Sequence, residues 1–291
     1  PDRIDAQSVR RFEREVVATA RLQHPNTVAI FDYGRAPDGV FYYAMAYLDG
    51  LTVDELVEHE GPLPAGRAIW LLSQVCASLD EAHSLGLVHR DIKPANIMVI
   101  GHTAAYDHVK VLDFGLVKAL AAELGATESQ SNELTGTPLY MAPECIARAD
   151  GAEPRSDLYA AAAVGYFMLT GKHVFEGKSV LEICADHLHT APVPVQQRVG
   201  RPVPPALEAV IMQGLAKTPS DRPASAAAFR EALAACAVEP WSEEQARNWW
   251  QTRGVELCRR PIDDADPTLA RTVEAIRSDS PEPRPSEPAL R

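Results

Sequence analysis

Three side chains that together suit phosphoryl transfer lie close in the sequence: Asp91, Lys93 and Asn96. A carboxylate can accept the proton of a hydroxyl group, a lysine can neutralise charge that develops on a phosphate, and an amide oxygen can bind Mg²⁺. Asp113 follows seventeen residues after Asn96, in Asp-Phe-Gly, and offers a second oxygen ligand for Mg²⁺. These residue types in this order indicate phosphoryl transfer to a hydroxyl, with Asn96 and Asp113 as the metal ligands.

The same residues belong to three motifs in a fixed order. His-Arg-Asp-x-Lys-x-x-Asn begins at His89, Asp-Phe-Gly begins at Asp113, and Ala-Pro-Glu ends at Glu144. Together they form the protein-kinase signature set, and residues 1–238 resemble a bacterial Hanks-type serine/threonine protein kinase. The resemblance implies an α+β, bilobal protein-kinase fold with a small β-rich lobe, its first strands missing, and a large, mainly helical lobe.

The resemblance also implies cofactors, partners and roles. ATP and Mg²⁺ are the expected cofactors, and Ser or Thr hydroxyls of proteins are the expected substrates in bacterial signalling, with a homodimer for autophosphorylation in trans. Asp91 is the catalytic base or the acid that orients the substrate, and Lys93, the serine/threonine form of the loop, contacts the γ-phosphate. His89 is structural and packs behind Phe114.

Four more residues take structural roles from the family pattern. Thr137 is expected to hydrogen-bond the catalytic acid and lysine. Asp157 is expected to anchor the backbone of the catalytic loop, and it also stands at a good helix-capping position. Glu144 is expected to be buried and therefore paired, because an isolated buried carboxylate is costly, and Arg222 is the matching partner in the family.

The adenine site is expected where the two lobes join. Met45 would be the gatekeeper at the back of the pocket, and the Ala46 carbonyl and Leu48 amide would pair with the adenine edge. Met98 would stack beneath the ring; simple core packing is nearly as good an interpretation of a methionine there and does not exclude that contact.

Apolar residues at helical spacing predict a helix over residues 8–23 that carries Glu15. In the resemblance, Glu15 holds a strand-borne lysine that contacts ATP; otherwise it is one more solvated helix charge. No Gly-rich loop occurs upstream, and no lysine precedes Lys93. We therefore expect a catalytic domain truncated at its N-terminus, with weak turnover from this fragment alone. If the chain is complete as given, a non-catalytic pseudokinase-like scaffold is the alternative.

Hydrophobic periodicity predicts the elements that hold these residues. Strands are expected at 27–33, 40–48, 97–100 and 109–112. Helices are expected at 53–59, 64–85, 156–170, 180–187, 205–215 and 224–235. Residues 191–205 are expected to form a Pro-rich loop.

The polar segment over 116–141 is expected to carry an activating phosphate at Ser129 or Ser131. The expected phosphate pocket, taken from the family, consists of three basic residues: Arg11, Arg90 and Lys118. Arg90 in particular would place a buried positive charge beside the catalytic acid. A phosphate brings about −1.5 to −2 charges, which is enough to order a loop against arginines. Alternatively, Glu128 or Glu133 partly fills the pocket, or the serines lie in a merely solvated loop.

Composition excludes several classes of protein. A formal net charge of −12 argues against a nucleic-acid partner, because a phosphate backbone requires a basic face. The five cysteines form no CxxC pair, which indicates reduced thiols and a cytoplasmic location rather than disulfides or zinc. No apolar run of about 18 residues occurs, so no membrane segment is expected in this chain. The histidines at 83, 102 and 108 are expected to have no metal-binding role.

The expected domain organisation has four parts. Residues 1–48 are the remainder of the small lobe, residues 49–238 the large lobe, residues 239–260 a short Trp-containing helix, and residues 261–291 a disordered linker or tail rich in Asp, Ser, Pro and Glu. Ser242 to Gln245 read as a capping box, and the aromatic face that follows is expected to dock on the lobe rather than on a partner.

Overall fold

The structure is a computed structural model that describes residues 19, 21–35, 41–101, 106–114, 138–148 and 151–258. Several predicted features lie outside these residues: most of the helix over 8–23, including Arg11 and Glu15, then Lys118, Ser129, Ser131 and Thr137, and the tail over 261–291. They remain predictions, as do the domain boundaries. At the end of the helix predicted over 8–23, residues 22 and 23 are not helical.

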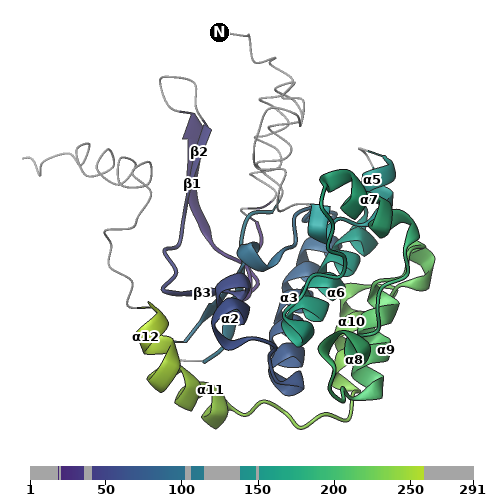
Figure 1. The fold of residues 1–291 in the computed structure, drawn as a ribbon. Coiled ribbons are helices and arrows are strands. Elements are labelled where there is room, and N and C mark those ends of the chain that lie inside the picture. Colours follow the sequence, from purple (N-terminus) through teal and green to yellow (C-terminus); the bar gives the residue numbers. More distant parts are fainter. Residues whose placement is uncertain are drawn as a thin grey trace, which may run out of the picture.

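The described strands form two antiparallel sheets. β1 (Ile30–Arg35) and β2 (Phe41–Met45) pair as a hairpin, which Figure 1 shows extending away from the helical body. The second sheet has the order β3 (Gly50–Thr52), β4 (Ile97–Ile100) and β5 (His108–Val111).

The first predicted strand is shifted along the sequence. Residues 27 and 28 do not belong to the hairpin, because this segment turns to β5 instead: the Val28 amide donates to the Val111 carbonyl at 3.0 Å, and the Val111 amide donates to the Asn26 carbonyl at 2.8 Å. The second predicted strand is shorter than expected and ends at Met45. The early segment therefore connects the hairpin to the sheet that flanks the catalytic loop.

Helices make up most of the remaining lobe. They are α2 (Val53–Glu60), α3 (Ala65–Ser84), α5 (Pro143–Ala147), α6 (Pro154–Thr170), α7 (Val180–His189), α8 (Val195–Val199), α9 (Pro205–Gly214) and α10 (Ala226–Ala234). Short 3₁₀ turns occur at η1 (Pro94–Asn96), η3 (Pro138–Tyr140) and η4 (Pro219–Asp221).

The centre of the lobe is α6, in which every residue from Ser156 to Thr170 is buried. A helix that is buried on all sides must pack against neighbours all round, and α6 lies against α3 and α9. Gly214 permits a close approach of α9, since a Cβ there would lie 2.5 Å from the Cβ of Ala162. The large lobe is therefore built around one helix.

A loop prediction and a helix-cap prediction are wrong. Residues 191–205 are not entirely loop, because α8 forms within them and ends at Gly200, whose φ of 67° suits glycine. Asp157 is not a helix cap, because α6 begins at Pro154 and its capping box is made by Glu153 and Ser156. Asp157 lies inside the helix, which leaves its carboxylate to bind the catalytic loop.

The Trp-containing segment is helical and docks on the lobe. Its helix α11 (Glu243–Trp249) begins with the expected capping box between Ser242 and Gln245, and continues as the π-helix η5 (Trp250–Gly254) and α12 (Val255–Cys258). Figure 1 shows this segment beside β3 and α2, far from α10 where the preceding chain leaves the bundle.

Among the described residues, no helix is both long and apolar enough to cross a membrane. All five cysteines are free thiols.

Candidate active site

The catalytic loop runs from the end of α3 to the start of β4 and gathers three predicted residues. Lys93 Nζ lies 2.9 Å from Asp91 Oδ2, and Asn96 Nδ2 donates to the same oxygen at 2.9 Å. Asn96 Nδ2 also donates to the Asp91 carbonyl at 2.9 Å. The carboxylate, the ammonium group and the amide that were expected together therefore meet at one point.

The geometry of Asn96 fits a role as a metal ligand. Both of its contacts with Asp91 use the NH₂ group, so the amide orientation directs the oxygen elsewhere. Within the described residues, no hydrogen bond to that oxygen is present. An amide oxygen that is held in place by its own nitrogen suits Mg²⁺, which prefers oxygen ligands.

Asp113 lies two residues beyond the end of β5. Its backbone has a φ of 49°, in the left-handed region that non-glycine residues seldom adopt. The Tyr43 hydroxyl of β2 donates to Asp113 Oδ1. Burial, together with this hydrogen bond, raises the pKa of Tyr43 well above its ordinary value, so the phenol remains a donor.

Together, Asn96 and Asp113 supply an amide and a carboxylate at the same end of one antiparallel strand pair, where Ile97 of β4 pairs with Val111 of β5. Among the described residues, no group of three or more His, Cys, Asp or Glu is arranged to hold a metal ion by itself. Mg²⁺ in phosphoryl-transfer sites is held by one or two carboxylates, with substrate phosphates and water completing the coordination. The residues present therefore fit Mg²⁺ bound with a nucleotide.

Asp157 of α6 holds the catalytic loop in shape, as predicted for it. Its Oδ2 accepts from the His89 amide at 2.8 Å, and its Oδ1 accepts from the Arg90 amide at 2.9 Å. His83 Nε2 lies 2.8 Å from Oδ2 as a third contact. A carboxylate that accepts two backbone N–H groups fixes the path of the chain immediately before Asp91.

His89 is fully buried and packs against Phe114, with ring centroids 4.5 Å apart. Its Nδ1 accepts from the Asp91 amide at 3.2 Å, and its Nε2 lies 2.8 Å from the Leu112 carbonyl. Burial lowers the pKa of His89, although the Asp157 charge opposes this. A neutral imidazole with a proton on Nε2 satisfies both contacts, and it links the catalytic loop to the Asp-Phe-Gly segment.

The expected adenine contacts are backbone groups between β2 and β3. The Ala46 amide donates to the Ala29 carbonyl at 3.1 Å. In the part of the chain that the structure describes, the Ala46 carbonyl and the Leu48 amide have no hydrogen-bond partner. Met45 is 41% exposed, and Met98 is half-buried in β4. These positions are compatible with the expected adenine contacts, which remain a prediction.

The predicted pair between Glu144 and Arg222 is present. Arg222 donates to both carboxylate oxygens at 2.7 Å, and Ser156 donates to Glu144 at 2.6 Å. Burial raises the pKa of Glu144, but the hydrogen bonds from Arg222 and Ser156 outweigh it and leave the pKa below its ordinary value. The carboxylate is therefore charged and paired.

Arg90 corrects one expectation, because its side chain is exposed rather than buried. Its backbone has a φ of 67°, and the hydrogen bond from its amide to Asp157 holds that backbone while the side chain stays at the surface. The other two residues of the expected phosphate pocket lie outside the described residues.

Two residues of the site were not predicted as such. Tyr43 contacts Asp113. Its position two residues before Met45, on the same face of a strand, is the sequence feature that could have indicated a place in the site. His83 was expected to be an unremarkable helix residue, yet it contacts Asp157. Nothing in the sequence distinguishes it from other histidines.

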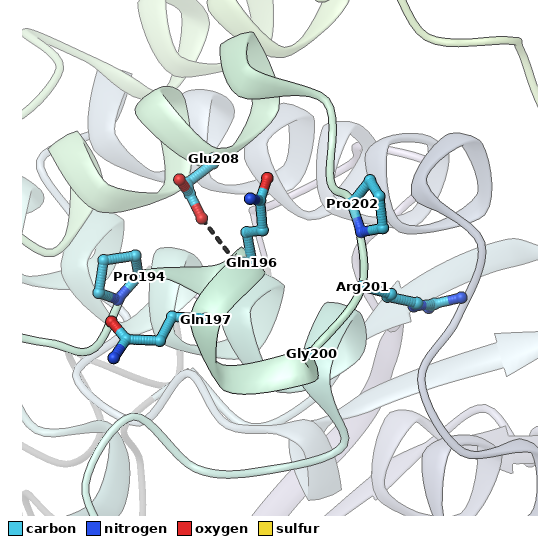
Figure 2. Close-up of a pocket in the computed structure, with 7 residues that line it drawn as sticks. All are labelled: Pro194, Gln196, Gln197, Gly200, Arg201, Pro202 and Glu208. Carbon is cyan, nitrogen blue, oxygen red and sulfur yellow. Dashed lines mark hydrogen bonds between the residues drawn. The ribbon is translucent and has the colours of Figure 1, made fainter.

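A separate cavity of about 350 Å³ opens on the surface at α8 and α9. Figure 2 shows the residues that line it: Pro194, Gln196, Gln197, Gly200, Arg201, Pro202 and Glu208. The Glu208 carboxylate closes one side by accepting from the Gln196 amide at 2.6 Å. No predicted catalytic residue lines this cavity, so it is distinct from the site.

Residues 2–234 match the family model described as the protein kinase domain. The chain belongs to the protein kinase family. The match covers the catalytic loop, the sheet that flanks it and the helical lobe, and it confirms the predicted α+β kinase fold. Protein kinases as a family use ATP together with a divalent metal.

Several bacterial serine/threonine-protein kinases are similar to this chain. The serine/threonine-protein kinase pkn3 of Myxococcus xanthus is 41% identical over 233 residues, which are 79% of this chain and 42% of the relative. PknB of Mycolicibacterium smegmatis is 40% identical over 226 residues, 77% of this chain and 35% of the relative. Pkn1 of Myxococcus xanthus is 40% identical over 232 residues, which are 79% of this chain and 32% of the relative. The matched region thus spans less than half of each relative.

Proposed function

We propose that this kinase domain transfers the γ-phosphate of ATP to serine or threonine hydroxyl groups of proteins in bacterial signalling. The observation that carries the proposal is the convergence of Lys93 and Asn96 on one oxygen of Asp91, at 2.9 Å each. The names of the bacterial relatives support the serine/threonine class. The intact site also favours an enzyme over a non-catalytic scaffold.

In this mechanism the Asp91 carboxylate accepts the proton of the substrate hydroxyl and orients its oxygen for attack on the γ-phosphorus of ATP. The bond from that phosphorus to the β–γ bridging oxygen breaks, and ADP leaves. The Lys93 ammonium group, held beside that carboxylate, neutralises charge on the transferred phosphate. The NH₂ group of Asn96 fixes Asp91 in place. Mg²⁺, when bound at Asn96 and Asp113, supplies charge neutralisation across the phosphate oxygens of ATP. Positioning and electrostatics then account for most of the rate.

The proposal extends to the surroundings of the site. Ala46 and Leu48 bind the adenine edge through their backbone, and a phosphate on Ser129 or Ser131 activates the enzyme. Autophosphorylation in trans requires a homodimeric encounter, so its rate per enzyme molecule should rise with enzyme concentration. We place the domain in the cytoplasm, where ATP is available and thiols such as its five free cysteines stay reduced.

The test is transfer of labelled γ-phosphate from ATP to protein serine or threonine, measured with the full-length natural protein. We expect Asp91→Asn to abolish transfer, and Asp80→Asn, a matched change on α3 away from the site, to preserve it. Transfer by Asp91→Asn at the wild-type rate would contradict the proposal. Absence of transfer and of ATP binding in the wild type would favour the scaffold.

A further inference from the structure

A buried ion pair lies outside the catalytic loop. Arg67, in the first turn of α3, and Asp107, immediately before β5, have side chains that are 2% and 0% exposed. Arg67 Nε donates to Asp107 Oδ2 and Nη2 donates to Oδ1, both at 2.8 Å. A desolvated pair of this kind is stable only when its remaining hydrogen-bonding capacity is satisfied.

Two tryptophans satisfy that capacity. Trp241 Nε1 donates to Asp107 Oδ2 at 2.8 Å, and Trp250 Nε1 donates to Oδ1 at 2.7 Å. Each carboxylate oxygen therefore accepts two hydrogen bonds. The Arg67 guanidinium carbon lies 4.1 Å from the ring centroid of Trp249 and 5.1 Å from that of Trp241. We call Trp241 and Trp250, whose indole N–H groups bind this ion pair, the tryptophan clasp.

Two glycines of the lobe leave room for the segment that carries the clasp. A Cβ at Gly101 would lie 1.7 Å from the Trp250 ring, and a Cβ at Gly66 would lie 2.3 Å from the Glu239 carbonyl oxygen. Asp107 adopts a φ of 53°, in the left-handed region that Asp enters more readily than most non-glycine residues. The two glycines leave space that the C-terminal segment fills.

The clasp binds Asp107 in the connection between β4 and β5, the strand pair that the expected metal ligands flank. Asp107 lies between β4 and β5; β4 begins directly after Asn96, and β5 ends two residues before Asp113. The Asp107 carbonyl accepts from Gln74 Nε2 at 2.8 Å, and Gln74 Oε1 accepts from the Val109 amide at 3.0 Å. One hydrogen-bonded network therefore runs from the clasp into the backbone of β5.

We infer that the tryptophan clasp positions the β4–β5 pair and, through it, the oxygens of Asn96 and Asp113, so that Trp250 is a positioning residue for binding of Mg²⁺ and nucleotide. The tryptophans of the clasp lie beyond residues 2–234 that match the kinase family model, whereas Arg67 and Asp107 lie within them. The link to Mg²⁺ and nucleotide rests on the proposed function, whereas the effect on β4–β5 does not.

Two adjacent tryptophans provide a matched pair of variants. Trp250→Phe keeps an aromatic ring but removes an N–H that binds a buried carboxylate. Trp249→Phe removes an N–H that, among the described residues, is buried without a hydrogen-bond partner. The two changes are chemically identical, and only the first opens the clasp.

The experiment measures binding of Mg²⁺ with a non-hydrolysable ATP analogue by calorimetry, in the full-length natural protein and well below its melting temperature. Contacts that support metal ligands are worth about 10- to 100-fold in affinity. The clasp does not contact the expected metal ligands directly but acts on them through β4 and β5. We therefore expect Trp250→Phe to weaken binding of Mg²⁺ with the analogue by less, about three- to tenfold. Trp249→Phe should bind as the wild type does, and the difference between the variants should vanish when EDTA removes Mg²⁺.

Hydrogen exchange of peptides that cover β4 and β5 is the second readout. We expect faster exchange in Trp250→Phe and wild-type exchange in Trp249→Phe. Gly101→Ala, which blocks the seat of Trp250 without changing any tryptophan, should reproduce both effects of Trp250→Phe.

The outcomes separate the two claims. A Trp250→Phe protein that melts earlier but keeps wild-type affinity and wild-type exchange in β4–β5 would overturn the inference, because the clasp would then be structural only. A wild type that fails to bind Mg²⁺ with the analogue would overturn the proposed function. In that case, faster exchange in β4–β5 for Trp250→Phe alone would still support positioning, and unchanged exchange would refute it.

Discussion

The Arg222 side chain is buried, and its guanidinium group is fully hydrogen-bonded. Besides Glu144, its guanidinium binds the carbonyl oxygens of Ala216, Arg155 and Lys217, and its side chain is 0% exposed. Arg222→Ala should lower the free energy of unfolding by about 3–5 kcal/mol, because the Glu144 charge would remain buried without its partner. Urea denaturation measures this loss.

A double variant provides the control for Arg222. Glu144→Gln combined with Arg222→Met removes both charges, so it should cost less than Arg222→Ala alone. Equal urea midpoints for the wild type and Arg222→Ala would show that the pair contributes nothing to stability.

His187 gives the stability of the lobe a pH dependence. It is fully buried, and burial, with the nearby Lys217 charge, lowers its pKa from 6.5 to about 4. Between these values the unfolded chain binds a proton that the folded chain does not, so the stabilisation is complete above pH 6.5 and is lost as the pH falls toward 4. The loss amounts to about 3 kcal/mol, measured by urea denaturation across this range.

Substitution within α7 isolates the contribution of His187. His187→Gln should flatten the loss of stability between pH 6.5 and 4, whereas His189→Gln, an exposed neighbour on the same helix, should leave it unchanged. Part of the slope should remain, because burial also lowers the pKa of His89. A wild-type slope in His187→Gln would contradict the assignment.

Individual residues were predictable where a motif fixed them. Asp91, Lys93 and Asn96 lie within one loop, so their proximity follows from local sequence. Trp250 and Asp107 are 143 residues apart, and their contact depends on where α11 docks. The periodicity of the segment predicts a helix with an aromatic face, but it carries no information on which buried acceptor an indole N–H will reach.

At the scale of elements, α6 acts as the support of the catalytic loop. Asp157→Asn would replace one of the two oxygens that accept the His89 and Arg90 amides with an NH₂ group, which cannot accept. The loop would then shift beside Asp91, and kcat should fall by up to about 100-fold. The KM for ATP should change less, since Asp157 lies behind the loop.

Steady-state kinetics on the full-length natural protein tests the role of α6. Asp221→Asn, an exposed change outside α6, serves as the control and should keep the wild-type kcat. If Asp157→Asn also kept it, the anchoring contacts would be dispensable for catalysis.

Elements were predicted well where one interaction dominates. The expected strand at 97–100 matches β4, because a run of apolar β-formers enters a buried sheet. α8 was missed because prolines flank it on both sides, and prolines were taken as evidence for a loop. Its five residues form a helix because Val195 is buried against the lobe, which is a tertiary effect that local propensity does not contain.

At the scale of the whole molecule, three motifs in register predicted the bilobal fold because each motif fixes a position in the active site. The arrangement of the two sheets and the return of the chain from α10 to β3 were not predicted. They depend on contacts between segments far apart in the sequence, such as the Arg67–Asp107 pair and the indoles that close it.

The position of the clasp determines which part of the molecule the tryptophan fluorescence reports. All four tryptophans of the chain belong to one cluster, because Trp70 Nε1 donates to the Asp107 carbonyl at 3.1 Å while the other three contact the ion pair. Tryptophan fluorescence therefore reports the local structure around the Arg67–Asp107 pair, whereas far-ultraviolet circular dichroism reports the helices of the whole lobe. If the clasp and the lobe unfold as one unit, urea curves from the two signals should coincide, as we expect. Emission that changed at lower urea would reveal a clasp that opens first.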